Sequence, residues 1–338
     1  MGKVRIGFIP LVDCALIAVA CELGLAERRG VRLVPSREPS WTAIRDKIAF
    51  GLLDAAQMLA PMPIAMTLGL GGLRVPMVAP MTLGLGGNAV TVSSALYDEM
   101  CAADPEAMAG PRILSARAVA QVARARRAAR RPRLRFASVF PFSTHLYELR
   151  LWLAGGGVDP DGDVNIVVIP PPRMVENMAS GLVDGFCVGE PWNQLAVSEG
   201  LGRIVAVKAD IAPDAPEKVL GLRRDWSEDN RQTVHTLVQV LAEAAEWSDG
   251  HPSELAELLA RDEWVGASPS LLLACLEGRP LLVKGEAGAD LPTYQTFRDG
   301  PVNAPRDTHV AWLIERMTGC GRGSDDVRQA VGAVYGAL

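Results

Sequence analysis

Hydrophobic residues follow two alternating patterns over residues 4–207 of the chain. Short apolar runs bounded by turn residues predict buried strands at 4–9, 31–34, 55–59, 75–78, 89–93, 136–140, 164–169 and 185–188. Between these runs, apolar residues recur at the spacing of one helix face. Strands that alternate with helices predict parallel sheets whose two faces are covered.

The predicted helices are bounded by residues with known local roles. Asp13 is placed to cap the first helix, and Arg28-Arg29-Gly30 is placed to end it. Pro61 and Pro63 stand where another helix would begin, at positions that lose nothing by lacking an N–H. The clearest apolar helix faces are Leu16, Val19, Ala20 and Leu23; Ile44, Ile48 and Leu52; and Met174, Val175, Met178 and Leu182. From about Asn230 the pattern becomes mostly helical.

The N-terminus is apolar enough to raise the question of a signal peptide. Lys3 and Arg5 are consistent with a charged leader, and 18–21 faintly resembles a lipoprotein cleavage site. Pro10 and Asp13, however, interrupt the clean apolar run that a signal peptide needs. We therefore expect no signal peptide. No stretch approaches the ~18 to 20 apolar residues of a membrane span.

Composition and charge narrow the class of protein. The chain has 338 residues, of which 49% are hydrophobic and 22% charged, so disorder is excluded and about two domains are expected. The net charge of −5 argues against a general nucleic-acid binder. The six cysteines, at 14, 21, 101, 187, 275 and 320, form no C-x-x-C pair, and we expect reduced, mostly buried thiols in a cytoplasmic protein.

Motifs of catalysis are sparse. The sequence has no G-x-x-x-x-G-K-S/T, G-x-S-x-G or H-E-x-x-H motif. Gly84, Gly86 and Ala89 match G-x-G-x-x-A, but a strand-like run follows where a dinucleotide site needs a helix. His145 and Glu148 are spaced to share a helix face, either as part of a metal site or as a plain helix-surface pair. We expect no enzyme activity, no cofactor and no metal.

The segment 112–135 is the most basic part of the chain, with nine arginines. Leu114, Ala118, Val119 and Val122 give a predicted helix over 115–130 an apolar stripe. Two interpretations of the arginines stay open. Either they solvate the opposite helix face, or they form a docking surface for an acidic partner or RNA.

Several strings occur together in a recognisable order. They are 6–13 (IGFIPLVD), 38–47 (EPSWTAIRDK), 58–63 (MLAPMP), 87–93 (GNAVTVS), 143–145 (STH), 184–192 (DGFCVGEPW) and 308–312 (THVAW). Together they resemble the nitrate- and bicarbonate-binding proteins of ABC importers. They are still more similar to the cytoplasmic nitrate/nitrite sensors of assimilation operons. The resemblance runs from residue 4 to about 316.

The resemblance implies an α/β fold of the periplasmic-binding-protein type: a two-lobed clamshell (type II) with a mostly helical C-terminal region. Lobe 1 would comprise 1–90 and 208–338, and lobe 2 would comprise 91–207. The chain would cross between the lobes near residue 90 and return near 207. The ligand would lie in the cleft between the lobes.

The resemblance also assigns ligand contacts. Trp41 lies in the first turn of its helix, His145 at another helix start, and Lys218 would supply a fixed positive charge. Asn88 stands where importers more often carry glutamine. The positions of His145 and Lys218 look less cationic in bicarbonate-binding members, which favours nitrate or nitrite here. The remaining residues assigned to ligand binding are Ser143, Thr144 and Glu190.

Three functional hypotheses follow. The first is a cytoplasmic sensor that binds nitrate or nitrite by clamshell closure and regulates nitrate assimilation through an RNA-binding antiterminator, with no direct nucleic-acid contact. The alternative is the solute-binding component of a nitrate or related-anion ABC importer, with a permease as partner and a periplasmic location. The third is an enzyme of thiamin pyrimidine synthesis, which shares the clamshell, but no string resembles the cysteine motif of that enzyme.

Overall fold

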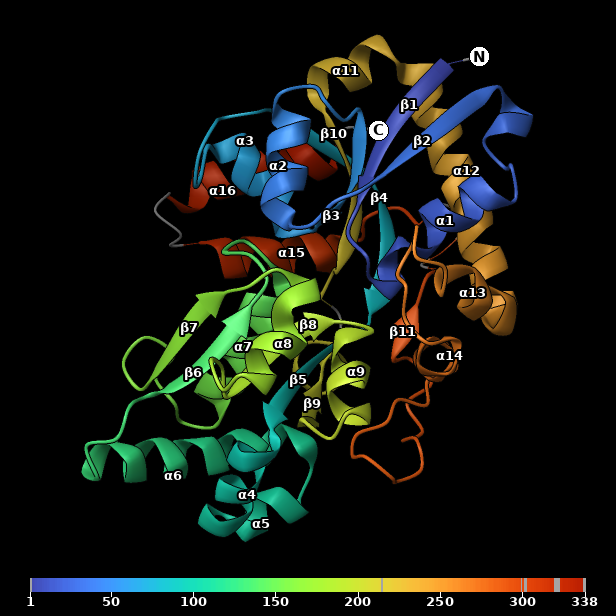
Figure 1. Ribbon diagram of the computed structural model, residues 1–338. Helices are drawn as coiled ribbons and strands as arrows, with labels where there is room; N and C mark the ends of the chain where they lie inside the picture. The colour runs from blue at the N-terminus through green and yellow to red at the C-terminus, as the bar shows by residue number, and fades with distance from the viewer. Residues whose placement is uncertain (1, 214, 299, 301–302, 319–322, 337–338) are drawn as a thin grey trace.

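The computed structural model describes residues 2–213, 215–298, 300, 303–318 and 323–336, and places them in two lobes, each built on one sheet (Figure 1). The upper sheet has six strands in the order β11-β4-β10-β3-β1-β2. Their bounds are β1 Gly2–Phe8, β2 Val31–Arg37, β3 Ala55–Leu59, β4 Met77–Gly86, β10 Lys218–Arg223 and β11 Gln295–Thr296. The lower sheet has five strands in the order β7-β6-β8-β5-β9. They are β5 Asn88–Ser93, β6 Leu134–Ser138, β7 Val164–Val168, β8 Gly185–Gly189 and β9 Gly202–Val207.

The expectation of purely parallel sheets is wrong for β5, β10 and β11, the last of which is antiparallel to β4. β1 pairs in parallel with β2 and β3, and β6 with β7 and β8, as predicted. In contrast, β10 is antiparallel to β3 and β4, and β5 is antiparallel to β8 and β9. The reason is that β5 and β10 are the first strands after the two crossings between sheets, so each enters its new sheet from the cleft side. The parallel strands of both lobes therefore end at the cleft.

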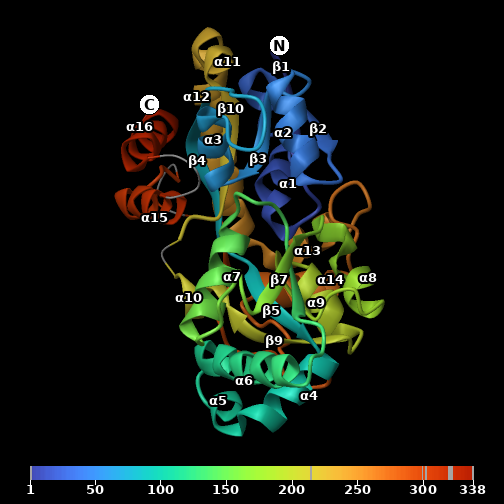
Figure 2. The same cartoon turned by 90° about the vertical axis from the view of Figure 1, so that its left-hand side faces the viewer.

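Helices cover the faces of both sheets. Those of the upper lobe are α1 Ala15–Glu22, α2 Trp41–Ala49, α3 Pro61–Leu68, α11 Arg224–Asp229, α12 Arg231–Gly250, α13 Pro252–Leu259, α14 Pro269–Leu276, α15 Asp307–Met317 and α16 Ser324–Tyr335. Helices α15 and α16 lie together along one side of this lobe (Figure 2). Those of the lower lobe are α4 Ser94–Ala103, α5 Pro105–Ala109, α6 Ser115–Ala128, α7 Thr144–Gly155, α8 Met174–Ala179, α9 Trp192–Ser198 and α10 Lys208–Ile211. The chain also has 3₁₀ turns at η1 Val12–Cys14, η2 Glu27–Arg29, η3 Arg112–Leu114 and η4 Pro171–Arg173. The mostly helical C-terminal region is confirmed.

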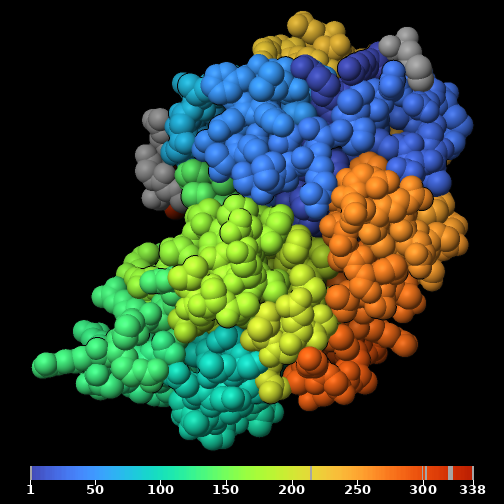
Figure 3. Space-filling model, in the orientation of Figure 1, coloured from blue at the N-terminus to red at the C-terminus, as the bar shows by residue number. Residues whose placement is uncertain are grey.

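The apolar core does not stop at the boundary between the lobes. In the upper lobe α1 packs against α12, and residues 15–20 of α1 are fully buried. A second apolar cluster joins Ile9, Trp41 and Met62 of the upper lobe to Phe186 and Val188 of the lower lobe. The space-filling view shows the two lobes in contact along this boundary (Figure 3). The two lobes are therefore packed against each other at this boundary.

Several local predictions are wrong. Asp13 makes no capping hydrogen bond, because the helix starts after it at Ala15 and the carboxylate is used in the cleft. Leu52 and Leu182 lie beyond the ends of their helices and are more than half exposed. Leu114 is also exposed, at 37%, because it precedes α6 in a 3₁₀ turn, whereas the rest of the predicted stripe is buried.

The glycine motif at 84–89 has no nucleotide-binding geometry. Gly84 and Gly86 lie inside β4, which continues almost directly into β5, so no helix follows them. This arrangement is consistent with the prediction that the motif does not bind a dinucleotide.

The described cysteines, 14, 21, 101, 187 and 275, are free thiols, while Cys320 lies outside the described residues. Among the described residues, no helix combines the length and apolar character that crossing a bilayer requires.

Candidate functional site

Charged and polar side chains are concentrated in the cleft, where the parallel strands of both sheets end. Asp13 follows β1, and Lys218 begins β10 in the upper lobe. Asn88 begins β5, and His145 lies in the first turn of α7, which follows β6. All four side chains are at most 1% exposed. Ligand sites of open α/β sheets occur at this end of the strands, so the cleft is the candidate site.

Lys218 is the buried cation of the upper lobe. Its Nζ lies 2.6 Å from Glu217 Oε1 and 3.0 Å from Asp13 Oδ2. Burial alone would lower the pKa of Lys218, but the carboxylates of Asp13 and Glu217 outweigh it, so the pKa is raised and the side chain stays charged. The Trp41 ring centroid lies 5.9 Å from the same Nζ, within reach of a cation–π attraction.

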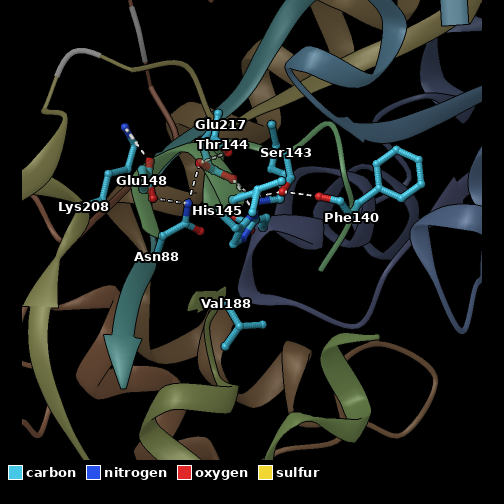
Figure 4. A network of polar contacts seen from close by, with 12 residues as sticks. Asn88, Phe140, Ser143, Thr144, His145, Glu148, Val188, Lys208 and Glu217 are labelled. Carbon is cyan, nitrogen blue, oxygen red and sulfur yellow. Dashed lines mark hydrogen bonds and ion pairs between the residues drawn. The ribbon is translucent and has the colours of Figure 1, made fainter. Parts of the chain in front are cut away.

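Glu217 connects the two lobes through its carboxylate (Figure 4). Its Oε2 accepts hydrogen bonds from Asn88 Nδ2 and from Thr144 Oγ1, each at 2.6 Å. Its Oε1 accepts the bond from Lys218 and lies 3.6 Å from His145 Nδ1. Glu217 therefore contacts four residues that the resemblance assigned to ligand binding.

Glu148 and Lys208 form the outer part of the same network (Figure 4). Asn88 Nδ2 also donates to Glu148 Oε2 at 3.0 Å, and Lys208 Nζ lies 3.6 Å from Glu148 Oε1. Lys208 further donates to the carbonyl oxygens of Ala212 and Ala215. Burial is the main cause that raises the pKa of Glu148 to about 7. The prediction of a plain surface pair for His145 and Glu148 is wrong, since both are fully buried.

His145 is a neutral group in this environment. Burial, followed by the positive charges of Lys218 and Lys208, holds the pKa of His145 well below its usual value. Neither ring nitrogen has a hydrogen-bond partner among the described residues. A buried donor left without a partner costs ~1 to 3 kcal/mol, so the ring is available to a ligand in the cleft.

Trp41 begins α2 and is completely buried. Ser40 caps this helix by accepting a bond from the backbone N–H of Ala43 at 3.2 Å. The Nε1 of Trp41 has no hydrogen-bond partner among the described residues, and neither has the Nε2 of Gln57. Gln57 Oε1 accepts from the backbone N–H of Ile9, which fixes the amide at the end of β1. These two N–H groups are further donors without a partner.

Ser143 and Glu190 have other partners. Ser143 Oγ caps α7 by accepting from the Leu146 N–H at 3.1 Å and donates to the Phe140 carbonyl at 2.7 Å. Glu190 accepts hydrogen bonds from the Tyr294 hydroxyl and from the Gln194 backbone N–H. Burial raises the pKa of Glu190 to about 7. The structure thus brings Asn88, Thr144, His145 and Lys218 together around Glu217, with Trp41 beside Lys218. Ser143 has a structural role, and Glu190 lies in a neighbouring network.

Sequence reasoning missed the acidic members of the site. Asp13 stands in one of the family-like strings, where its position predicts a helix cap, and Glu217 precedes Lys218 directly. The one available signal was the charge of Glu217 next to a lysine expected to be buried, since a buried lysine needs a carboxylate partner. Gln57 and Lys208 carried no signal that set them apart from surface residues. Among the described residues, no group of three or more His, Cys, Asp and Glu side chains is arranged to hold a metal ion.

Comparison with known proteins finds one family and several relatives with nitrate-related names. The profile of the NMT1-like family matches residues 2–261. The chain is 42% identical over 325 residues to the nitrate import ATP-binding protein NrtC of Synechocystis sp., a match that covers 94% of this chain and 46% of NrtC. It is 34% identical to the nitrate/nitrite binding protein NrtA of Nostoc sp., over 92% of this chain and 69% of NrtA. This chain therefore spans about half of the first relative and about two thirds of the second.

A solved structure has the same architecture. The crystal structure of the periplasmic nitrate-binding protein NrtA from Synechocystis matches 99% of this chain and 86% of its own, with a TM-score of 0.85 and 26% identity. The two-lobed α/β fold of the periplasmic-binding-protein type is thereby confirmed.

Proposed function

The chain belongs to the NMT1-like family and to its nitrate-binding, periplasmic-binding-protein-like members, and from this premise we propose that it binds nitrate or nitrite in the cleft between its lobes. The observation that carries the proposal is the fully buried Lys218, whose Nζ lies 5.9 Å from the Trp41 ring centroid and whose partner Glu217 also contacts Asn88 and His145. A buried cation with several converging N–H groups suits a small anion.

The chemistry of the anion fits these donors. Nitrate is planar, carries one negative charge and accepts hydrogen bonds weakly, so it needs several donors and one cation. The indole N–H of Trp41 and the ring of His145 supply neutral donors, while Lys218 supplies the charge. The first turns of α2 and α7 face the same cleft with backbone N–H groups, which favour negative charge by ~0.3 to 1 kcal/mol each.

Calorimetric titration of the purified chain tests the proposal. Nitrate, nitrite, bicarbonate and an alkanesulfonate would be titrated separately at the same pH and ionic strength. We expect saturable binding of nitrate or nitrite with a stoichiometry of one, and weaker binding of the other two. Tight binding of bicarbonate or the sulfonate with no response to nitrate would contradict the assignment.

Clamshell closure is the proposed binding movement. The lower sheet, β5 to β9, would move with its helices as one lobe and the upper sheet with its helices as the other, with bending at the two crossings between the sheets. An anion that binds both lobes favours the closed state by its differential affinity. Small-angle scattering should show a smaller radius of gyration when nitrate is added, and an unchanged radius would contradict closure on binding.

Recognition of the anion for an importer is the biological role best supported. Two relatives carry names of nitrate import or nitrate/nitrite binding, and the solved relative is periplasmic. In this role the partner is an ABC permease. Co-purification with the membrane permease, and recovery of the chain from the periplasmic fraction, would support it.

A cytoplasmic sensor is the second candidate, favoured by a different observation. The C-terminal end of α6 and the loop after it project from the lower lobe, away from the upper lobe (Figures 1 and 3). Arg127 is 86% exposed there, and the side chain of Arg131 is 55% exposed. Exposed charge of this kind sets the rate and specificity of encounter with an acidic partner such as an antiterminator. Fractionation with intact-mass measurement of the N-terminus separates the two roles.

A further inference from the structure

Glu217 binds the donors that the proposed anion requires. Its carboxylate accepts from Lys218 Nζ, Asn88 Nδ2 and Thr144 Oγ1, all at 2.6 Å. His145 Nδ1 lies 3.6 Å from the same group. A carboxylate resembles nitrate in being a planar anion with oxygens as acceptors. An anion that binds Lys218 and Asn88 must therefore displace or share the donors of Glu217.

The charge balance of the cleft opposes a second anion. Three buried carboxyl groups, those of Asp13, Glu148 and Glu217, face two buried ammonium groups, those of Lys208 and Lys218. Lys218 already pairs with Asp13 and Glu217, and Lys208 with Glu148. An added anion therefore finds no unpaired ammonium group in this cluster. Like charges a few Å apart in a buried site repel strongly, and the repulsion is relieved when one group takes up a proton.

We propose that Glu217 is an internal competitor for the anion site, whose carboxylate sets the affinity of the cleft and couples anion binding to uptake of a proton by the buried cluster. The inference rests on the proposed function, since it assumes that a small anion binds beside Lys218.

The surrounding groups decide where the proton goes. Those that face Glu217 or its direct partners are Asp13 from η1, Asn88 from β5, Thr144, His145 and Glu148 from α7, Lys208 from α10, Lys218 from β10 and Gln295 from β11. Glu148 shares the Asn88 amide with Glu217, and its pKa of about 7 is raised first by burial and then by the charge of Glu217. An additional anion raises this pKa further, so Glu148 accepts the proton near neutral pH. Anion affinity is accordingly higher at pH 6 than at pH 8.5.

The Glu217→Gln variant tests the proposal because it keeps the size of the side chain and removes its charge. We expect nitrate to bind this variant at least about tenfold more tightly than the wild type at pH 8, because a like charge beside Lys218 is removed. The pH dependence between 6 and 8.5 should also be flatter. The matched control is Asp54→Asn, which removes a carboxylate paired with Arg5 at the opposite end of β3 and should leave affinity and pH profile unchanged.

A measurement on the wild type keeps the proposal testable if the variant does not fold. Calorimetry in two buffers with different ionisation enthalpies gives the number of protons bound with each nitrate. Uptake of a substantial fraction of one proton at pH 7.5 supports the coupling, and zero uptake overturns it.

The outcomes separate this proposal from the proposed function. If the wild type binds nitrate and Glu217→Gln binds it equally or less tightly, Glu217 is not a competitor, while the anion-binding function stands. If only Glu217→Gln binds nitrate, Glu217 is supported as a competitor, while nitrate binding by the wild-type chain is contradicted. If neither binds any anion of the panel, the proposed function fails and this inference fails with it.

Discussion

The cleft and the arginine-rich end of α6 are both dense in charge, but they differ in what the charges contact. In the cleft, Lys218 and Glu217 are completely buried and paired within 2.6 Å. At the end of α6, Arg126, Arg127, Arg130, Arg131 and Arg133 line a hollow of about 430 Å³ open to solvent. Charges in water interact weakly, and buried ones strongly, so the charges of the cleft have the larger energetic role.

The comparison also shows how each region depends on its neighbours. Arg126 pairs with Glu99 at 2.8 Å and is 13% exposed, so it fixes α6 to α4. Arg127 lies 3.9 Å from Asp163 and is mostly solvated. The cleft network, in contrast, crosses between lobes, because Asn88 and Thr144 donate to Glu217 from other elements. Changes in the cleft should therefore alter both stability and binding, whereas changes in the exposed arginines should alter neither by much.

The largest effect is expected from Lys218→Ala. Removal of the ammonium group leaves Asp13 and Glu217 without their cation, and nitrate binding should weaken by at least about 2 kcal/mol. Calorimetric titration measures the affinity, and thermal unfolding confirms that the variant is folded. Lys47→Ala is the control, because that lysine pairs with Glu38 and is 41% exposed. Unchanged affinity in Lys218→Ala would remove Lys218 from the site.

A second, smaller effect concerns Glu148 and pH. Its pKa in the folded protein, about 7, is above the usual 4.5, so the folded state binds the proton more tightly. The resulting stability is fully present below pH 4.5 and is lost as the pH rises through 7. In Glu148→Gln, the fall in unfolding free energy between pH 6 and 8.5 should be smaller by about 1 to 1.5 kcal/mol.

Denaturant titrations of the wild type and Glu148→Gln across this pH range give the comparison. His145 acts with the opposite sign, since its lowered pKa gives stability that is present above its ordinary value of 6.5 and lost as the pH falls below it. Measurements above pH 6.5 therefore report mainly on the carboxyl groups. Parallel pH profiles for the two proteins would contradict the role assigned to Glu148.

A more local effect is expected from Gly189→Ala. A Cβ at this position would lie 3.4 Å from Asp13 Oδ2 and 3.6 Å from both Asn88 Oδ1 and His145 Nε2, which are ordinary contact distances. The variant should fold with little loss of stability, within about 1 kcal/mol, but the methyl group reaches into the anion site. We expect nitrate affinity to fall several-fold. Equal affinities would place the anion elsewhere in the cleft.

The smallest effect is expected from the exposed arginines. Arg126 is retained because of its pair with Glu99, and Arg124, Arg127, Arg130 and Arg131 are changed together to Gln. Nitrate affinity should stay within about twofold of the wild type, because exposed charges beyond a Debye length of ~8 Å are screened. Association with an acidic partner should slow at low salt. Unaltered association rates would mean that these arginines only solvate the helix face and do not contribute to partner binding.

The sequence predicted the parts of the fold that depend on local pattern. β3 at 55–59 and β8 near 185–188 appear where their short, mostly apolar runs predicted them. The antiparallel direction of β5 and β10 could not be predicted this way, because it depends on which lobe a strand leaves. Leu52 and Leu182 fit a helix face by spacing, but their helices end before them.

For the site, the resemblance supplied the donors but not the acceptors. Trp41, His145 and Lys218 stand in family-like surroundings, so their positions were expected in the cleft. Asp13 contacts Lys218 from a distant part of the chain, and such a pairing leaves no local pattern, whereas Glu217 is adjacent to Lys218 and its charge is the one local signal. Burial of His145 and Glu148 was equally hidden, since a polar pair at helix spacing is usually solvated.

The strand order has a consequence for how the chain folds as it is synthesised. All strands of the lower sheet come from one continuous stretch, 88–207. The upper sheet cannot be completed from its first four strands, because β10, at 218–223, lies between β3 and β4. A growing chain can therefore finish the lower sheet while β4 still lacks its partner β10. The first half of the upper lobe is the segment that would need protection from aggregation until residue 223 has been made.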